Sequence, residues 1–357
     1  MIDVCVTEVF VNGGNSYQRG LAYGEAAKPA ILRCIDHYAE YIRKSTGMNW
    51  ETACKAAKMF EASIQEFRPE YLDEMKGIAE GAGVAYEDIL AINCRSELYA
   101  LKEGLLPECT AFAVMPSASK DGHVLAGQNW DNNYGQRDCM VIVHIYQQDK
   151  PDVMLFTEAG FIGGKGMNSA GLSLTLNALE TNFNAKGVPL HIKMRAALDA
   201  SHIAQAYENV AKAPSAVGAN LIITSGDGVA LSAEITPNGV DAILPENGVI
   251  AHTNHLLSPI LQQKSPDNWR SWGTTFVRLC RLRELLNGHH DIDKEYLFKV
   301  MRDHSGHPCS ICYHPVEKAP TIETMATNYS VVMDTTEKVA YFCAGQPCEG
   351  EYKEYRI

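Results

Sequence analysis

The hydrophobic pattern of the chain changes character near residue 108. Before that point, apolar residues recur three or four positions apart, which is the spacing of one face of a helix. The run from Ile31 to Ile42 follows this spacing, and Pro29 lies where such a helix could begin, because the missing N–H of proline costs nothing there. Roughly the first hundred residues are therefore predicted to be mainly helical, with further helices at about residues 51–67, 69–82 and 86–101.

From residue 109 onward, short runs rich in Val, Ile, Thr and aromatic residues are separated by turn dipeptides such as Asp121-Gly122. This texture is typical of β-strands joined by tight turns. Two helical stretches, at about 189–213 and 272–287, interrupt it. Many strands with few helices favour a layered α+β architecture, and the lack of a flexible linker favours one domain over residues 1–357. The strands are predicted at about residues 109–116, 123–130, 140–147, 153–158, 172–177, 219–225, 229–235, 249–253, 328–334 and 339–343.

Composition narrows the class of protein. Of the 357 residues 46% are hydrophobic, so the chain can bury a large core. The formal net charge is -12 and no block of Lys or Arg stands out, which argues against nucleic-acid binding. We find no secretory signal in the first residues and no apolar run near the roughly 18 residues that span a bilayer. The 11 cysteines form no small-domain disulfide framework, so we expect a soluble, cytoplasmic protein with reduced thiols and no membrane partner.

Cys109 stands where the helical pattern gives way to the strand pattern. A thiol at the start of a strand can attack the peptide bond that precedes it and expose a new α-amine. If residues 109–116 and 123–130 form a hairpin centred near residue 120, Cys109 faces Asp131, with Cβ atoms roughly 4.5–5.5 Å apart. A carboxylate there would orient the amine and influence its proton affinity.

The terminal position matters because of the acid–base chemistry of the thiol. A free cysteine has a pKa near 8.5, so only a few per cent is thiolate at neutral pH. An α-amine titrates near 7.7–8.0, where a general base works well. Cleavage of the Glu108–Cys109 bond would supply that base without a histidine. The hairpin alone supports this function only modestly, because most cysteines in such a chain are buried and inert.

A series of short motifs adds specificity. They are Gly20, Tyr23-Gly24, Ala26-Ala27-Lys28, Gly77-Ile78-Ala79, Gly127-Gln128-Asn129-Trp130-Asp131, Thr157-Glu158-Ala159-Gly160, Asn168-Ser169-Ala170-Gly171, Asn177-Ala178-Leu179, Gly187-Val188-Pro189, His252-Thr253-Asn254-His255 and Ser310-Ile311-Cys312. In order and spacing they resemble the acyl-coenzyme A:6-aminopenicillanic acid acyltransferase family from about residue 15 to about residue 335. The resemblance implies a four-layer αββα sandwich of the N-terminal-nucleophile hydrolase type.

The resemblance also implies a self-processed precursor. Residues 1–108 would remain bound, as a heterodimer partner, to the catalytic fragment 109–357. Carried over by motif, Cys109 would be the nucleophile, Asp131 would hold the new amine and Asn254 would donate to the oxyanion.

Other site positions follow from the same motifs with roles left open. Asn177 belongs to the same shell as Asn254, and Thr110 and Ser310 match positions near the nucleophile. Two residues depart from the pattern: Glu108 replaces a glycine before the cleavage cysteine, and Tyr313 replaces an arginine after Ser-Ile-Cys. The first change puts efficient self-cleavage in doubt, and the second puts penicillin-type substrates in doubt, because a guanidinium fork suits a carboxylate.

The hypothesis is thus a cysteine amidohydrolase or acyltransferase that acts on a small N-acyl compound without a cofactor or metal. One alternative is an uncut thiol hydrolase in which His252 or His255 activates Cys109. Another is an interaction protein stabilised by zinc at the His and Cys cluster of residues 304–314. That cluster lacks a separated second pair of ligands, which favours a loop beside the substrate pocket.

Overall fold

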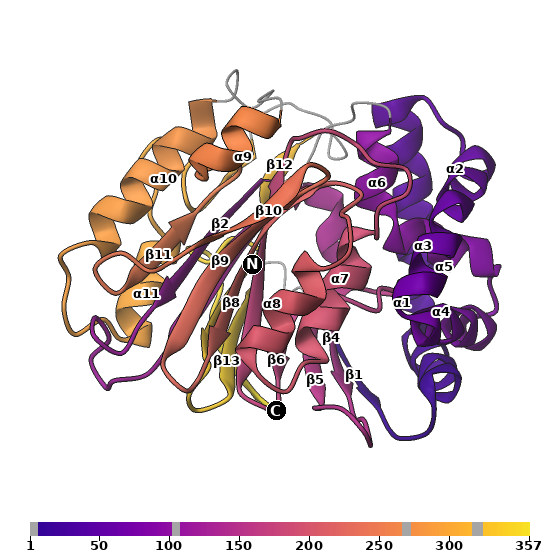
Figure 1. Cartoon of the computed structure of the whole chain (residues 1–357), viewed down its shortest axis with the longest axis horizontal. Helices are drawn as coiled ribbons and strands as arrows, with labels where there is room; N and C mark the ends of the chain where they lie inside the picture. Colours follow the sequence, from indigo (N-terminus) through magenta and orange to yellow (C-terminus); the bar gives the residue numbers. More distant parts are fainter. Residues whose placement is uncertain (1–5, 102–107, 266–272, 316–323) are drawn as a thin grey trace.

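Two β-sheets lie face to face in the computed structural model, which describes residues 6–101, 108–265, 273–315 and 324–357. The first sheet has eight strands in the order β1-β4-β5-β6-β7-β8-β9-β10, and the second has six in the order β11-β2-β3-β12-β13-β14 (Figure 1). The strand bounds are β1 Thr7–Val11, β2 Glu108–Val114, β3 Leu125–Asn133, β4 Met140–Ile145, β5 Val153–Glu158, β6 Lys165–Asn168, β7 Leu172–Leu179, β8 Gly218–Ser225, β9 Val229–Thr236, β10 Gly239–Ile243, β11 Val249–His252, β12 Met325–Asp334, β13 Val339–Ala344 and β14 Lys353–Arg356.

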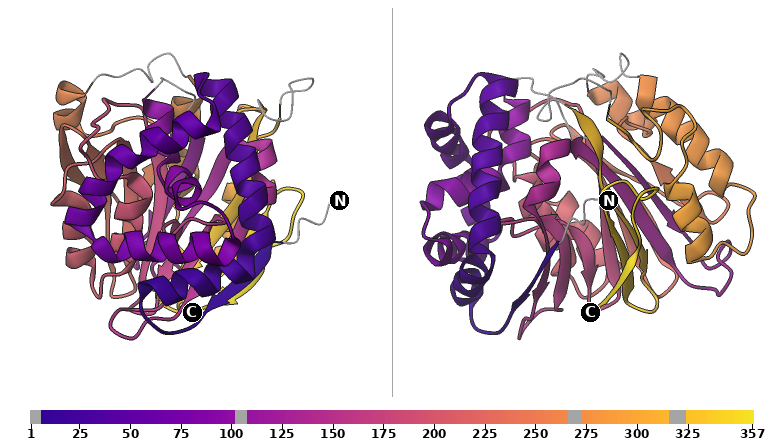
Figure 2. Two further views of the ribbon diagram at one scale, coloured as in Figure 1. Left: turned by 90° about the vertical axis from the view of Figure 1, so that its right-hand side faces the viewer. Right: turned by 180° about the vertical axis from the view of Figure 1, so that it is seen from behind.

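Helices cover the outer faces of both sheets (Figure 2). On one side, α7 contacts β6 and β7, and α8 contacts β8 and β9, with the N-terminal helices beyond β1 and β4. On the other side, α10 contacts β2 and β11, and α11 contacts β3 and β12. The helix bounds are α1 Ser16–Thr46, α2 Trp50–Ala57, η1 Lys58–Phe60, α3 Glu61–Phe67, α4 Pro69–Ala82, α5 Tyr86–Asn93, α6 Arg95–Ala100, η2 Tyr134–Cys139, α7 Leu190–Leu198, α8 Ile203–Ala211, α9 Pro259–Lys264, α10 Gly273–Leu286 and α11 Lys294–Met301.

The molecule is therefore a four-layer α/β/β/α sandwich, as the resemblance implied. The space between the sheets is filled by a cluster that includes Cys109, Trp130, Phe156 and Phe342. Because β2 and β3 both contact β7 across this layer, the start of β2 lies over the middle of the opposite sheet. Within the described ranges, none of the helices is long and apolar enough to cross a membrane.

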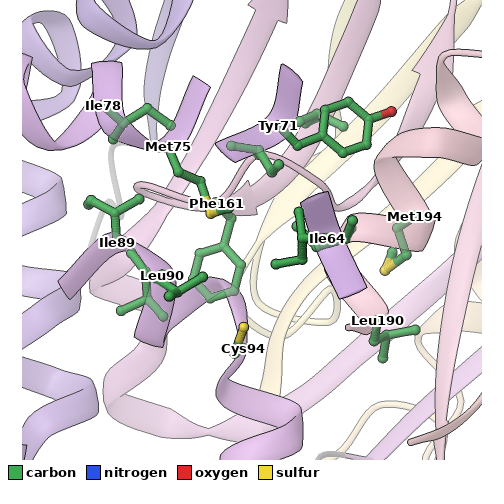
Figure 3. Packing of buried hydrophobic residues seen from close by; sticks show 14 of the residues in the cluster. Ile64, Tyr71, Met75, Ile78, Ile89, Leu90, Cys94, Phe161, Leu190 and Met194 are labelled. Atoms are coloured by element: carbon green, nitrogen blue, oxygen red, sulfur yellow. The ribbon is translucent and has the colours of Figure 1, made fainter. Parts of the chain in front are cut away.

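A second core joins the N-terminal helices to the first sheet. Figure 3 shows Phe161, which follows β5, surrounded by Met75, Ile89 and Leu90 from the helices. All four side chains are fully buried. The helical N-terminal part is thus packed on the sheet through a continuous apolar layer, and much of its stability comes from that burial.

Helix α1 begins earlier than predicted, so Pro29 lies inside it and not at its start. The helix begins after Asn15, whose side chain accepts a hydrogen bond from the N–H of Gln18, while Gln18 reciprocates in a capping box. An interior proline costs a helix about 3 kcal/mol. Packing of α1 against α4 offsets that cost over the long shared interface.

The sequence pattern located most strands but missed the less regular elements. Strands β1, β10 and β14 lie at sheet edges, where one side of the strand has no neighbouring strand. Such a strand does not need the continuous apolar run of a central strand. Strand β6 has four residues, one of them glycine, and helices α9 and α11 are short. The predicted helix at 189–213 is two helices, α7 and α8, separated at residues 199–202, while residue 272 of the predicted helix 272–287 lies outside the described residues.

Candidate active site around Cys109

The hairpin that carries Cys109 differs in register from the predicted one. Cys109 lies opposite Trp130, and Asp131 lies opposite Glu108. The predicted pairing of Cys109 with Asp131 is wrong by one residue, because the strands leave a connection of residues 115–124 centred between 119 and 120. Successive side chains of a strand point to opposite faces, so Cys109 faces the layer between the sheets while Asp131 shares the other face with Glu108.

The thiol of Cys109 is fully buried in the uncut chain. Burial raises the pKa of Cys109 to about 12, and the negative charge of Asp131 acts in the same direction. The charges of Lys165 and Arg278, and a backbone hydrogen bond from Asp131, favour the thiolate and partly oppose this shift. The Cys109 thiol is therefore held protonated in this buried position.

The backbone of Cys109 is fixed on both sides. Its N–H donates to Oδ1 of Asn254 over 2.9 Å. Its carbonyl oxygen accepts from Arg278 at 2.7 Å and from Nδ2 of Asn177 at 3.1 Å. Nδ2 of Asn254 donates to the carbonyl of Ala178 over 3.0 Å. In the uncut chain Asn254 thus meets Cys109 through its oxygen, whereas the predicted oxyanion role would use its Nδ2.

Asn177 is itself held in place by neighbouring strands. Its Oδ1 accepts from Nδ2 of Asn220 at 3.0 Å, and the Oδ1 of Asn220 accepts from the hydroxyl of Ser232 at 2.6 Å. All three side chains are buried. This chain of amides leaves Nδ2 of Asn177 directed at Cys109, so both asparagines that the motifs singled out reach the cysteine.

Arg278 is the main residue of the site that the sequence analysis missed. It extends from α10, is fully buried, and forms an ion pair with Glu108. It also donates to the hydroxyl of Thr110 and to Oδ1 of Asn254, each over 3.0 Å. The available signal was its position, because Arg278 interrupts the buried stripe of α10 next to Leu279. Arg278 thus places a buried guanidinium beside Cys109 and Glu108.

Asp131 is a buried carboxyl with an incomplete set of partners. Its Oδ1 accepts from the hydroxyl of Thr327 at 2.6 Å, and its Oδ2 has no hydrogen-bond partner among the described residues. Burial raises the pKa of Asp131 to about 7, although the charge of Arg278 acts to lower it. The site therefore contains an acceptor that another donor or cation would stabilise.

The remaining predicted positions line the same region. The Thr110 hydroxyl is an acceptor for Arg278, as described above. The Ser310 hydroxyl donates to the carbonyl of Cys312 at 2.6 Å, so it shapes its own loop. The N–H of Tyr313 donates to the hydroxyl of Thr327 at 2.9 Å, and the N–H of Thr327 donates to the carbonyl of Tyr313 at 3.0 Å. Tyr313 is thus linked to Asp131 through Thr327.

Lys165 is a second residue that the sequence pattern missed. Its Nζ lies 4.1 Å from the ring centroid of Trp130 and 5.3 Å from that of Tyr329, and it has no hydrogen-bond partner among the described residues. Burial lowers the pKa of Lys165 to about 8. This cation lies between the sheets on the side of Cys109 and favours its thiolate.

The two histidines of the alternative hypothesis are engaged elsewhere. His252 is fully buried, with Nε2 at 2.8 Å from Oε1 of Glu234 and Nδ1 at 2.7 Å from the carbonyl of Thr253. Nδ1 of His255 lies 2.8 Å from the hydroxyl of Thr275. With both nitrogens of His252 occupied, the geometry favours a base other than this ring for Cys109.

Two stacked sheets between helical layers, with a cysteine at the start of an inner strand, define the class of N-terminal-nucleophile enzymes that hydrolyse amides or transfer N-acyl groups. The family model for acyl-coenzyme A:6-aminopenicillanic acid acyl-transferase matches residues 117–349, and the chain belongs to this family. It is 29% identical over 342 residues to the acyl-coenzyme A:6-aminopenicillanic-acid-acyltransferase 40 kDa form of Emericella nidulans, covering 94% of this chain and 91% of that protein.

Solved structures with partial similarity include two hydrolases. A mutant of conjugated bile acid hydrolase from Clostridium perfringens aligns over 70% of this chain and 97% of its own, with 15% identity and a TM-score of 0.47. Penicillin V acylase from Agrobacterium tumefaciens aligns over 66% of this chain and 83% of its own, with 14% identity and a TM-score of 0.38.

Proposed function

We propose that this protein cuts its own Glu108–Cys109 bond and then uses Cys109 to hydrolyse or transfer the acyl group of a small N-acyl compound. The observation that carries the proposal is the buried Asp131 carboxyl, whose Oδ2 lacks a hydrogen-bond partner among the described residues. Asp131 is the cross-strand neighbour of Glu108, so a new α-amine on Cys109 would form next to it. That amine would supply the missing donor and a compensating positive charge.

The proposed cleavage converts the peptide bond into a thioester. Sγ of Cys109 attacks the carbonyl carbon of Glu108, the bond to the Cys109 nitrogen breaks, and that nitrogen takes up the thiol proton. Water then hydrolyses the thioester, which leaves a carboxyl terminus on Glu108 and restores the thiol. One water is consumed for one peptide bond, and fragments 1–108 and 109–357 result.

In turnover, the new amine of Cys109 acts as the general base for its own thiol, since α-amines titrate near 7.7–8.0. Oδ1 of Asn254, which accepts from the Cys109 nitrogen in the uncut chain, would orient the amine. We assign Nδ2 of Asn254 to the developing oxyanion, a contribution that typically amounts to about 10²–10³ in rate. Water or an amine then accepts the acyl group from the thioester.

Arg278 suggests the chemistry of the acyl group. In self-cleavage Glu108 is the acyl donor, and its carboxylate is bound by Arg278 and by the hydroxyl of Thr274 at 2.9 Å. A glutaryl group places a carboxylate at the same distance along the chain from its acyl carbon. An acyl compound with such a carboxylate is therefore the substrate class that this side of the site favours.

Intact-mass measurement of the recombinant protein tests the proposal. The unmodified chain should give two fragments that begin at residues 1 and 109, and Cys109→Ala should remain one inactive chain. Asn220→Ala, which removes a support of Asn177 without touching Cys109, should still be cut but more slowly. An active enzyme that remains a single uncut chain would refute self-processing, and cleavage of Cys109→Ala at the same bond would assign it to another nucleophile.

A further inference from the structure

Two histidines and two cysteines from distant parts of the chain converge at one point. His304, Cys312 and His314 lie between α11 and β12, and Cys348 lies between β13 and β14. Their donor atoms all lie within 4.8 Å of one another. The residues at 304–314 lacked a separated second pair in the sequence, and Cys348 supplies the distant ligand.

The distances between donor atoms fit a tetrahedral metal site. Nε2 of His314 lies 3.1 Å from Nε2 of His304, 3.5 Å from Sγ of Cys312 and 3.3 Å from Sγ of Cys348. The two sulfur atoms are 3.6 Å apart. Zinc bonds of about 2.3 Å to sulfur and about 2.0–2.1 Å to nitrogen require edges of about 3.3–3.8 Å in a tetrahedron. Three of these four edges lie in this range, and the edge between the two histidine nitrogens, at 3.1 Å, is slightly shorter.

Hydrogen bonding alone does not satisfy these four atoms. A neutral imidazole carries a single N–H, and a thiol is a weak donor. The Nε2 atom of His304 and the sulfur atoms of Cys312 and Cys348 all lie near Nε2 of His314. A proton on Nε2 of His314 can form a hydrogen bond with only one of these three atoms. One divalent cation would accept a lone pair from all four atoms.

The turn that presents Cys348 is fixed by a neighbouring side chain. Nε of Arg302 donates to the carbonyl of Pro347 at 2.7 Å, and its Nη2 donates to the carbonyl of Gly350 at 3.3 Å. Arg302 ends α11, two residues before His304. The same anchor therefore places the distant cysteine beside the first histidine.

The loop with the other ligands is also braced. The N–H of Cys312 donates to the carbonyl of Asp303 at 3.0 Å, and Nδ2 of Asn129 donates to the carbonyl of Ile311 at 2.8 Å. Asn129 lies in β3, so the loop is tied to the second sheet. The ligands are thus held on a scaffold that exists without metal contacts.

We propose that His304, Cys312, His314 and Cys348 bind one structural Zn²⁺. Four protein ligands of the Cys₂His₂ type close the coordination sphere, so this metal would have no open position for substrate or water. It would fasten the segment after β13 to the loop before β12. The proposal stands independently of self-processing at Cys109.

The position of the site links it to the catalytic region. Cys312 and His314 flank Tyr313, whose backbone pairs with Thr327, and Thr327 donates to Asp131. The metal would therefore stabilise the loop that holds Thr327 and, through it, Asp131. It would not take part in the reaction.

Metal analysis of tag-free, full-length protein tests the proposal. We expect about one zinc per chain to survive gel filtration. Cobalt substitution should give the intense visible bands of a tetrahedral site, together with thiolate-to-metal charge transfer. Protein without bound zinc that also fails to take up cobalt would overturn the proposal. So would a Cys312–Cys348 disulfide, detected as two fewer titratable thiols in zinc-free protein.

Two variants and one control make the test specific. His304→Ala removes an exposed ligand and should leave the fold intact. Like Cys348→Ser, it should weaken zinc binding by more than the roughly 10–100-fold that loss of an outer-shell partner costs. Cys309→Ser, in the same loop but outside the cluster, should retain zinc and the cobalt spectrum. Retention of zinc by both ligand variants would refute the assignment.

Discussion

At the residue scale, the buried Asp131 makes the uncut chain sensitive to pH. Its pKa is raised from 3.8 to about 7, so the folded chain holds the proton more tightly than the unfolded chain. The contribution of Asp131 to the free energy of unfolding is fully present below about pH 4. It is lost as the pH rises to about 7. At a slope of about 1.4 kcal/mol per pH unit, the total loss reaches about 4 kcal/mol.

Denaturation of two uncut variants checks this pH dependence. Cys109→Ala should become less stable between pH 4 and pH 7 relative to the double variant Cys109→Ala/Asp131→Asn, with no further divergence above pH 8. A stability difference that stays constant over this range would show that Asp131 does not titrate as expected. Only the change with pH is diagnostic, because the asparagine also alters the contact with Thr327.

Arg278 gives a second prediction at this scale, which concerns substrate choice. An N-glutaryl amide should be turned over with a kcat/KM at least about tenfold higher than the N-pentanoyl amide of the same amine, since one added charge-assisted hydrogen bond is worth about 1.5–3 kcal/mol. The two compounds have equal chain length and differ by the carboxylate. Equal turnover of both compounds would contradict a role of Arg278 in substrate choice and limit it to self-cleavage. If neither compound is turned over, the glutaryl class is wrong, and the intact-mass experiment tests self-cleavage separately.

At the scale of elements, the crossing of α1 and α4 depends on glycine. A Cβ added at Gly24 would lie 2.3 Å from the carbonyl oxygen of Ile78, and one at Gly77 would lie 2.1 Å from that of Tyr17. We expect Gly24→Ala to destabilise the fold by about 1–3 kcal/mol, even though alanine is the better helix former by about 1 kcal/mol. Gly273→Ala, whose added Cβ would meet nothing within 4 Å among the residues that the structure describes, is the control and should be neutral. Equal effects of both in urea denaturation would contradict this account.

The elements also show what the sequence could and could not predict. Strands β5 and β8 are buried on both faces, so their apolar runs were unambiguous. The edge strands β1, β10 and β14 were not predicted, because an edge strand needs few apolar residues. At the site, motifs placed Cys109, Asn177 and Asn254 together, because each lies on a strand or the turn after it. Arg278 could not be placed, since its partners are distant in sequence and only the packing of α10 brings it to Cys109.

At the scale of the whole molecule, the two expected fragments share buried ion pairs. Arg95 lies 3.1 Å from Glu158, and Arg195 lies 2.8 Å from Glu74, with all four side chains buried. Each pair joins the region before Glu108 to the region after it. Breaking such a pair by removing one partner typically costs about 3–5 kcal/mol.

We therefore expect the cut fragments to migrate as one species in gel filtration and to separate only in denaturant. Arg95→Met should lower the denaturant concentration at which they part, whereas Arg43→Met, which removes an exposed pair with Glu40, should not. Dissociation of the fragments under native conditions would contradict the shared core.

The contacts that surround Cys109 imply an order of events during biosynthesis. Asn177, Asn254 and Arg278 bind the amide and carbonyl of Cys109 and the carboxylate of Glu108, and they come from three widely separated segments. A nascent chain in which residue 278 has not yet left the ribosome lacks part of these contacts. Scission would then serve as a maturation checkpoint, which only chains that have completed their tertiary structure can pass.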